Sequence, residues 1–426
     1  MVNSQPAGDA LFSRMGLSPQ LLGVISALKF TVPTPIQARA IPVAVTGKDV
    51  IGIAQTGTGK TLAFLLPMLQ ALKGSNRQGL IVVPTRELAA QVEEQLYDIG
   101  ESLGVRQALL IGGASMGKQI SDIRRFPNVI IGTPGRILDH MKQRTLTLNN
   151  VKVLVLDEAD RMLDMGFAPQ IRSILEQVPR ERQTMLFSAT MPPEIATMAA
   201  RHMKTPVRVE VARAGSVAEC VNQKLFVVPR DQKNSLLDKL LSDYTGAVLV
   251  FSRTKYGAQK VCRLVRGMNH SAAEIHSNLS QSQRRRSLAG FKSGAYRVLV
   301  ATDIAARGID VADIELVINY DLPDKADDYI HRVGRTGRAG KAGQAISFVT
   351  PDQQGKIREI ERALRFALPV SPLPSSSLKQ AARTSPERRP RALRRVEFAR
   401  PNSGPARQKG PASAEASAGR RIRVHR

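Results

Sequence analysis

Residues 49–61 read DVIGIAQTGTGKT, and this stretch decides the fold. An apolar run, DVIGIA, is followed by a glycine-rich loop that ends in Lys-Thr and opens a helical segment. A strand, such a loop and a helix in this order form the setting that a phosphate-binding loop requires. The glycines let backbone N–H groups approach a phosphate, and the helix N-terminus adds the positive end of its dipole. We therefore predict an α/β domain that binds a nucleotide phosphate here.

Apolar runs of the same kind recur along the chain, with helical patterns such as residues 86–104 between them. They are rich in Val, Ile and Leu and lack in/out alternation, which is typical of fully buried parallel strands. The helical segments supply the crossovers that parallel strands need. Since the runs fall into two series, we predict two successive α/β domains with open parallel sheets. The first series covers 49–54, 80–84, 108–113, 128–134, 151–160 and 183–190, and the second covers 246–254, 272–277, 296–303, 315–321 and 345–350.

The length of 426 residues is too great for one compact core and favours two domains with an appendage. We place the domains at 1–208 and 209–368, because the interval 205–220 lacks a strong helical or strand pattern. From 369 to 426 the composition shifts to Arg, Ala, Pro and Ser, and residues 371–426 hold 14 Lys or Arg against 3 Asp or Glu. Such a segment cannot bury enough apolar surface to offset its ordering entropy, so we expect a disordered basic tail.

The charge balance indicates the kind of partner. The chain has 62 basic and 36 acidic residues, a formal charge of +26, which is typical of proteins that bind nucleic acid or an anionic membrane surface. No apolar run reaches the length of a membrane-spanning helix, and the first residues lack the pattern of a secretory signal. Neither Cys220 nor Cys262 has a neighbour at metal-ligand spacing, so both are interpreted as buried thiols in a reducing compartment. We expect a cytoplasmic protein without membrane contact.

The phosphate-binding loop supplies the first set of site residues. Lys60 is expected to reach the β- and γ-phosphates of a nucleotide, and the Thr61 hydroxyl is expected to ligate Mg²⁺. The strict pattern has Gly at the position of Ala54, so the alternative is a glycine-rich turn that ends in Lys-Thr by chance. The nucleotide-binding residues of this loop are Ala54, Gln55, Thr56, Gly57, Thr58, Gly59, Lys60 and Thr61.

Residues 157–160, Asp-Glu-Ala-Asp, close the apolar run VKVLVL. Asp157 at the end of this expected strand is placed to hold Mg²⁺. Glu158 is placed to orient and deprotonate the attacking water. Taken alone, these residues fit a cluster of acids in the first turn of a helix equally well, because the helix dipole favours acids there. The phosphate-binding loop upstream favours the catalytic interpretation.

A glycine-arginine segment, HRVGRTGR at 331–338, lies in the second expected domain. Arg335 and Arg338 are candidates to reach a γ-phosphate and to stabilise transition-state charge, as arginine fingers do. The alternative is an exposed basic loop without a defined ligand. Because the segment lies in the second domain, it completes the nucleotide site only when the two domains close.

Together these segments resemble the DEAD-box family of ATP-dependent RNA helicases, over about residues 10–365. The resemblance implies two tandem RecA-like domains that use ATP and Mg²⁺. KFTVPTPIQ at 29–37 resembles the adenine-recognising Q motif, which implies that Gln37 hydrogen-bonds the adenine edge and that Phe30 packs near its ring. Phe12 stands at the position of the upstream aromatic of that motif.

The resemblance also implies residues that couple the nucleotide to the rest of the protein. SAT at 188–190 matches the element that links hydrolysis to RNA release. Asp310 resembles the ribose contact, in a nucleotide-binding segment that includes Gly308. His331 resembles the residue that couples to residues 157–160.

For RNA, the resemblance implicates residues at strand ends in both domains. Many are small residues and backbone groups, which suits a grip on sugar and phosphate without reading the bases. Lys29 and Ser277 depart from the pattern, because the family usually has Gly there, and FSRTKYGA and LDMGF favour the bacterial RhlE-type branch. The implied RNA-binding residues are Thr85, Arg86, Gly113, Thr133, Pro134, Gly135 and Arg136 in the first domain, and Arg253, Arg284, Thr302 and Asp303 in the second.

Two other classes of function share parts of this pattern. A DNA helicase or translocase also has two RecA-like domains, but the combination of DEAD, SAT and Q motif favours RNA. A non-enzymatic RNA-binding clamp would lack part of the catalytic set, yet Lys60, Glu158 and the motif arginines are all present. We predict a monomer with RNA-stimulated ATP hydrolysis, coupled to domain closure and to local duplex unwinding or remodelling of RNA–protein complexes. Ribosomal or RNA-degradation assemblies are family-level expectations for its partners.

Overall fold

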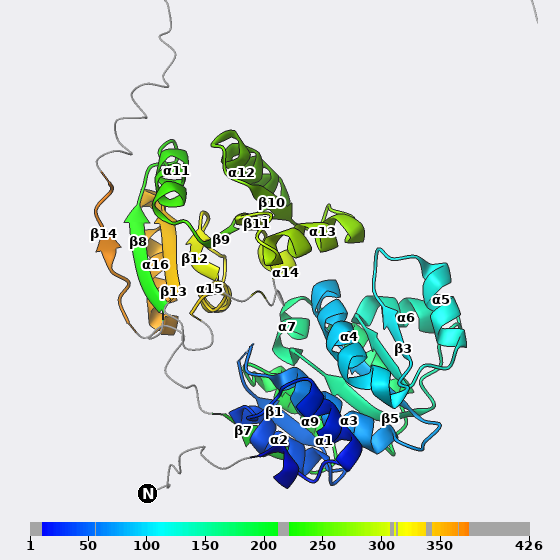
Figure 1. The fold of residues 1–426 in the computed structure, drawn as a ribbon. Coiled ribbons are helices and arrows are strands. Elements are labelled where there is room, and N and C mark those ends of the chain that lie inside the picture. The colour runs from blue at the N-terminus through cyan, green and yellow to red at the C-terminus, as the bar shows by residue number, and fades with distance from the viewer. Residues whose placement is uncertain are drawn as a thin grey trace, which may run out of the picture. The chain divides into compact units, whose positions relative to one another are not determined.

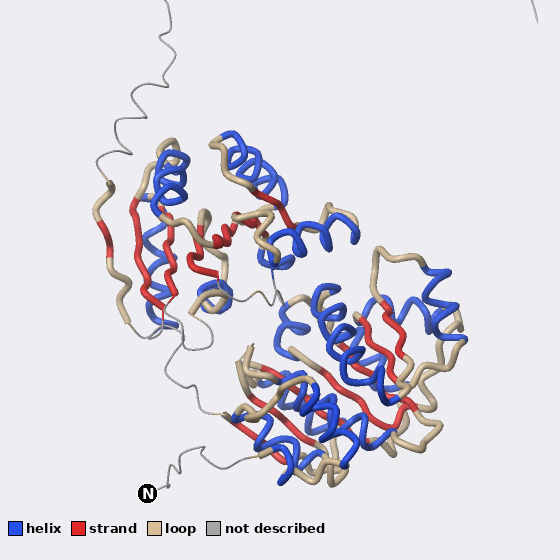
Figure 2. The backbone as a smooth tube through the Cα atoms, viewed as in Figure 1, coloured by secondary structure: helices blue, strands red, loops and turns tan. Residues whose placement is uncertain are grey.

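A computed structural model of the chain describes residues 11–55, 57–211, 221–306, 311, 314–337, 343–364 and 366–374. The described strands form two seven-stranded sheets, and every pairing between neighbouring strands is parallel. Both sheets belong to one compact unit of the chain. None of the described helices is long and apolar enough to cross a membrane. Figures 1 and 2 show each sheet lying among its own helices.

The first sheet has the strand order β3-β4-β2-β5-β6-β1-β7. Its interior strands are buried along almost their whole length, as continuous Val, Ile and Leu runs require when both faces of a sheet are covered. The strands are β1 (Val50–Ile53), β2 (Gln78–Val82), β3 (Gln107–Leu110), β4 (Val129–Gly132), β5 (Val151–Leu156), β6 (Gln183–Ser188) and β7 (Val207–Glu210).

Helices cover both faces of this sheet and make two apolar cores. One core is formed with α1, α2, α3 and α4, and the other with α6, α7, α8 and α9. The helices are α1 (Pro19–Ala27), α2 (Pro35–Ala44), α3 (Lys60–Leu72), α4 (Arg86–Gly100), α5 (Met116–Arg124), α6 (Pro134–Lys142), α7 (Ala159–Asp164), α8 (Ala168–Gln177) and α9 (Pro193–His202), with short 3₁₀ helices η1 (Phe12–Arg14) and η2 (Glu101–Leu103).

The second sheet repeats this plan with the order β10-β11-β9-β12-β13-β8-β14. Its strands are β8 (Val221–Val227), β9 (Ala247–Phe251), β10 (Ala272–Ile275), β11 (Val298–Ala301), β12 (Ile314–Asn319), β13 (Gly343–Val349) and β14 (Val370–Ser371). One face is covered by α11 and α12, and the other by α13, α14, α15 and α16. The helices are α11 (Lys233–Asp243), α12 (Lys255–Gly267), α13 (Gln281–Lys292), α14 (Asp303–Ala306), α15 (Ala326–Val333) and α16 (Gln354–Leu364), with η3 (Pro351–Gln353).

The prediction of two α/β domains with parallel sheets is confirmed, and each predicted apolar run overlaps a strand. The sequence patterns missed β7, β8 and β14. β7 lies inside the interval 205–220 that showed no strong pattern, and most of its side chains are exposed or half-buried, so the apolar signal is weak. The predicted boundary at 208 falls within β7, and β14 lies beyond the one at 368. The tail from 375 onward lies outside the described residues.

Candidate nucleotide and RNA site

The sequence motifs of the first domain follow strands that are neighbours in its sheet. The phosphate-binding loop, DEAD and SAT follow β1, β5 and β6, which are adjacent in the order β5-β6-β1. Three motifs predicted to bind RNA, namely PTRELA (84–89), the glycine pair at 112–113 and TPGR (133–136), follow β2, β3 and β4, which are adjacent in the order β3-β4-β2. The carboxyl ends of parallel strands meet at one edge of a sheet. The motifs predicted to bind nucleotide therefore occupy one half of this edge, and those predicted to bind RNA occupy the other.

The phosphate-binding loop has the backbone that its glycines predict. Gly57 and Gly59 have φ angles of 83° and 86°, in the left-handed region that favours glycine. A Cβ atom on Gly59 would lie 2.5 Å from the side-chain nitrogen of Gln37, so glycine is also required for space. Lys60 begins α3, is buried, and donates from Nζ to the carbonyl of Ala54 at 3.0 Å. Its ammonium is thus held inside the loop.

Gln37 supports this loop from α2. Its Nε2 donates to the carbonyl of Gly59 at 2.9 Å, and its Oε1 accepts from the backbone N–H of Thr34 at 2.9 Å. Phe12 is buried in the core of the first domain, whereas Phe30 is 41% exposed. The structure thus joins the Q-motif segment to the phosphate-binding loop, while the adenine contacts of these side chains stay predictions.

The DEAD segment buries two carboxylates beside each other. Burial raises the pKa of Asp157 to about 6, although the charge of Lys60 partly offsets that effect. Burial alone would also raise the pKa of Glu158, but the charges of Arg161, Lys60 and Arg335 outweigh it and hold that pKa below its usual value. Glu158 pairs with Arg161 at 2.7 Å and has a φ angle of 53°, a conformation that L-residues rarely adopt. An ionised, fixed carboxylate is what a general base requires.

Asp160 was not predicted as a site residue, yet it joins DEAD to SAT. Its Oδ2 accepts from the backbone N–H groups of Ala189 and Thr190 at 3.1 and 2.8 Å. Its own N–H donates to the Ser188 hydroxyl at 3.2 Å. Since β5 and β6 are neighbours, their carboxyl ends place these two motifs in contact. Adjacency of strands was the missing information, because sequence spacing alone does not give strand order.

The predicted RNA residues of the first domain come together at three strand ends. Arg86 lies against the glycine pair, where a Cβ on Gly113 would be 2.3 Å from a guanidinium nitrogen, and the φ angle of Gly113 is 77°. Arg136 donates to the carbonyl of Ala114 at 3.3 Å. Thr85 caps α4 by accepting from the N–H of Leu88. Thr133, Pro134 and Gly135 form the start of α6, where Gly135 faces open space.

In the second domain, Arg253 follows β9 and is partly exposed. Its backbone N–H donates to Asp321 Oδ2 at 3.1 Å. Thr302 and Asp303 follow β11, next to β9 in the sheet. The Asp303 carboxylate accepts from the Arg332 guanidinium at 2.7 Å, which the sequence did not predict.

Arg284 of α13 is buried and pairs with Glu87 of PTRELA, Nε to Oε1, at 2.7 Å. Arg284 was predicted to contact RNA, and Glu87 was not assigned. The Glu87 carboxylate, which lies within a predicted RNA motif, therefore pairs with the Arg284 guanidinium group that we expected to contact RNA phosphate.

The glycine-arginine segment places a half-buried His331 and a buried Arg335 at the end of α15. Arg335 Nε donates to the carbonyl of His331 at 3.1 Å. Burial, together with the positive charges of Arg161 and Arg335, lowers the pKa of His331 to about 4. His331 is therefore neutral at neutral pH. Four further predicted residues, Thr56, Gly308, Asp310 and Arg338, lie outside the described residues.

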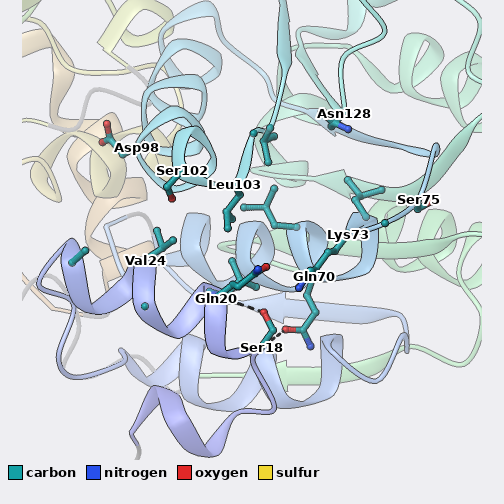
Figure 3. Close-up of a pocket in the computed structure, with 18 of the residues that line it drawn as sticks. Ser18, Gln20, Val24, Gln70, Lys73, Ser75, Asp98, Ser102, Leu103 and Asn128 are labelled. Atoms are coloured by element: carbon teal, nitrogen blue, oxygen red, sulfur yellow. Dashed lines mark hydrogen bonds between the residues drawn. The ribbon is translucent and has the colours of Figure 1, made fainter.

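A cavity of about 930 Å³ lies away from these motifs, among α1, the end of α3 and η2. Figure 3 shows Ser18 beside Gln70, whose side-chain oxygen accepts from the Ser18 N–H at 2.8 Å. Lys73 and Asn128 also line the cavity and precede β2 and β4, so the cavity lies at the amino ends of the strands. Ligands of open α/β sheets bind at the other end, and we assign no nucleotide to this cavity.

Comparison with known proteins adds family matches over both domains. Residues 34–198 match a family described as DEAD/DEAH box helicase, and residues 232–340 match one described as helicase conserved C-terminal domain. The chain is 42% identical over 371 residues to an ATP-dependent rRNA helicase, RRP3, of Debaryomyces hansenii, across 86% of this chain and 78% of the relative. It is 43% identical over 357 residues to the DEAD-box ATP-dependent RNA helicase CshA of Bacillus subtilis, across 83% and 72% of the two chains. The solved structure of S. cerevisiae Dbp5 bound to RNA and ADP BeF3 matches with a TM-score of 0.78 and 31% identity, across 88% of this chain and 99% of that one.

Proposed function

This chain belongs to the DEAD-box family of ATP-dependent RNA helicases, and from that premise we propose where its own residues hold ATP and RNA. ATP binds at the carboxyl ends of β5, β6 and β1, and RNA binds at those of β3, β4 and β2. The observation that carries this assignment is the strand order, which gathers each group of motifs on adjacent strands of one sheet. One rigid sheet thus holds both ligands.

In the proposed nucleotide site, Lys60 exchanges its contact with the carbonyl of Ala54 for the β- and γ-phosphates. Glu158, whose lowered pKa keeps its carboxylate ionised, orients the attacking water and accepts its proton. Arg335 lies close enough to lower the pKa of Glu158, which supports its role as the arginine that stabilises charge on the γ-phosphate. Arg338 keeps the same predicted role.

Asp157 and Thr61 are the residues that we propose to hold Mg²⁺. A buried carboxylate and a hydroxyl at the first turn of α3 are hard oxygen ligands, which suit this ion. Among the described residues no cluster of three or more His, Cys, Asp or Glu is arranged as a metal cage. Mg²⁺ commonly takes one or two protein ligands plus phosphate and water, so this donor set fits it. When bound, the ion would neutralise charge that develops on the phosphates.

For RNA, we propose a grip on sugar and phosphate by Thr85, Arg86, Gly113 and Arg136, extended in the second domain by Arg253 and Thr302. Guanidinium groups and backbone N–H groups at helix starts bind phosphate without reading bases. His331 and Arg335 already act electrostatically on the DEAD segment, and we propose that domain closure on ATP and RNA fixes this approach while RNA competes with Glu87 for Arg284. Local duplex unwinding or remodelling of RNA–protein complexes would follow from that closure.

The test is ATP turnover with matched single-stranded RNA and DNA, using the wild type and Glu158→Gln. We expect RNA to stimulate turnover and DNA to stimulate it little, because the proposed grip includes contacts to the ribose. Glu158→Gln should stall turnover while ATP and RNA still bind. Stimulation by DNA equal to that by RNA would favour the DNA translocase, and unaltered turnover in Glu158→Gln would contradict the role of the carboxylate.

A cytoplasmic location, a monomeric state and work in ribosomal or RNA-degradation assemblies remain proposals for this chain. The name of the relative from Debaryomyces hansenii, an rRNA helicase, makes ribosome assembly the first pathway to test. The RhlE-type branch also stays a prediction.

A further inference from the structure

The charged side chains of α12 are all basic, a feature that α12 shares with α13 (QSQRRRSLAGFK) among the described helices of the second domain. α12 reads KYGAQKVCRLVRG, with four basic residues and no acidic one. α11 and α16 carry both signs, in KNSLLDKLLSD and QGKIREIERAL. A helix face that serves only solubility typically mixes the two signs. The charge of α12 therefore indicates an anionic partner.

The residues of α12 divide cleanly between two faces. Ala258, Val261, Cys262 and Val265 are buried against the sheet. Lys260 follows Tyr256 after four residues, and Arg263 follows Lys260 after three. These three side chains therefore lie on one stripe of the helix, opposite its buried face. All three are exposed, and the Tyr256 ring is 67% exposed although tyrosine usually buries its ring. In the described part of the chain, Lys260 and Arg263 make no ion pair.

This stripe begins close in sequence to Arg253, which we propose to contact RNA. Arg253 lies two residues before α12, and Thr254 caps the helix by accepting from the N–H of Gly257 at 2.9 Å. Lys255 and Tyr256 then form the first turn, where the Lys255 ammonium lies 5.2 Å from the centre of the Tyr256 ring. From Tyr256 to Arg263 the helix rises by about 10 Å.

We propose that the exposed stripe of α12 extends the RNA-binding surface of the second domain. It binds the part of a single RNA strand that continues past Arg253. This inference rests on the proposed RNA contact of Arg253. Phosphates pair with Lys260 and Arg263, and one base stacks on the ring of Tyr256. Basic side chains with an exposed aromatic between them are the combination that sequence-independent single-strand binding uses. The extension lengthens the footprint on RNA without adding base preference.

The experiment measures the affinity of the full-length protein for single-stranded RNAs of increasing length, at several salt concentrations. The variants are Lys260→Ala/Arg263→Ala, Tyr256→Ala and Tyr256→Trp. The matched control is Arg358→Ala/Arg362→Ala, which removes the same charge from exposed positions of α16 on the other face of the second sheet.

For the longer RNAs, we expect the double variant of α12 to lower the log–log salt slope by about 1.4, since each lost single-strand phosphate contact contributes about 0.7. Tyr256→Ala should weaken binding roughly 5- to 150-fold, and Tyr256→Trp should restore it, because stacking needs a ring. The losses should shrink as the RNA is shortened, and the α16 control should keep the wild-type slope.

Several outcomes would overturn the extension. The α12 variants could bind every RNA as the wild type does, or the α16 control could lose as much as they do, which would indicate a general effect of charge. Binding of polyglutamate that is lost in the α12 variants, with RNA binding intact, would assign the surface to an acidic polypeptide instead. If α12 does not bind RNA, the wild type should still show RNA-stimulated ATP turnover. If RNA does not stimulate turnover of the wild type, the proposed helicase function itself is contradicted.

Discussion

The carboxylate of Asp160 accepts both the backbone N–H and the hydroxyl of Thr190, at 2.8 and 3.0 Å. Asp160 ends the DEAD segment, and Thr190 ends SAT, so one carboxylate ties the loop after β5 to the loop after β6. Its pKa is lowered, because the charge of Lys60 and the hydrogen bonds of Thr190 outweigh the effect of burial. Lys60, which we propose to bind phosphate, therefore acts electrostatically on the carboxylate that holds SAT.

The first prediction follows from this link. Thr190→Ala removes the hydroxyl and should lower duplex unwinding more than ATP turnover, because the carboxylate of Asp160 keeps its backbone contacts but loses one that fixes SAT. Thr190→Ser should retain unwinding. The control is Thr197→Ala, an exposed threonine of α9 whose hydroxyl donates only to a carbonyl within its own helix. Equal losses of turnover and unwinding in Thr190→Ala would argue against a coupling role. The measurements are ATP hydrolysis and strand separation on the same RNA duplex.

The second prediction separates binding from chemistry at the nucleotide site. Lys60→Ala should weaken ATP binding, because the positive charge that the loop holds near the phosphates is lost. Glu158→Gln should bind ATP and RNA together but hydrolyse little ATP, because only the proton acceptor is removed. Nucleotide affinity and single-turnover hydrolysis measure the two effects. Indistinguishable phenotypes for the two variants would contradict the assigned roles.

Much of this site could be predicted from the sequence, because each motif is a local pattern tied to a strand end. The left-handed backbone at Gly57 and Gly59 follows directly from their positions in the loop. Lys29 stands where the family usually has Gly, and the structure shows why glycine suits this position. The φ angle of Lys29 is 61°, in the left-handed region that favours glycine. At Ser277 the φ angle is not positive, so Ser fits there without that requirement.

What the sequence did not provide is contact between segments far apart in the chain. The Glu87–Arg284 pair joins residues 197 positions apart, and no spacing rule predicts it. Arg332 likewise stood among the motif arginines as one more basic residue. In the structure it is fully enclosed, pairs with Asp303, and stacks over the Phe251 ring at 4.9 Å. Its contacts with Asp303 and the Phe251 ring separate this structural arginine from Arg335, and these contacts depend on the tertiary fold.

The third prediction uses that separation. Arg335→Ala should slow ATP hydrolysis by roughly 10³ and lower the melting temperature less than Arg332→Ala does. Arg332→Ala should destabilise the second domain by about 3–5 kcal/mol, because it leaves the Asp303 carboxylate without its buried partner. Thermal unfolding and RNA-stimulated turnover are measured for both variants. A large drop in melting temperature for Arg335→Ala would make that arginine structural as well.

The fourth prediction concerns pH. The pKa of His331 falls from 6.5 to about 4 on folding, so the unfolded chain binds a proton between these values while the folded protein does not. Stability is therefore full above pH 6.5 and is lost as the pH falls toward 4, by about 2 kcal/mol at pH 5. His331→Gln should remove that part of the pH dependence. Urea unfolding of both proteins at pH 7 and pH 5 tests this, and an unchanged difference between the two pH values would show that His331 does not contribute.

The last prediction concerns the basic tail, which the sequence alone describes. The cut belongs after residue 374 and not after 370, because Val370 and Ser371 form β14 and pair with β8. Residues 375–426 hold all 14 basic side chains of the tail and almost no aromatic ones, so they should bind phosphate by counterion release and add little base preference. Deleting 375–426 should weaken RNA binding for every sequence, because a tether raises the local concentration of RNA at the two domains.

If half of these side chains contact single-stranded RNA, the log–log salt slope should fall by about five units, since each contact contributes about 0.7. ATP turnover at saturating RNA should be retained, because every catalytic residue lies upstream of the cut. The control replaces the tail with a Gly/Ser segment of equal length, which keeps chain length and removes charge. Identical salt slopes for full-length and truncated proteins would make the tail a solubility segment, and loss of turnover at saturating RNA would mean that the deletion disturbs the folded domains.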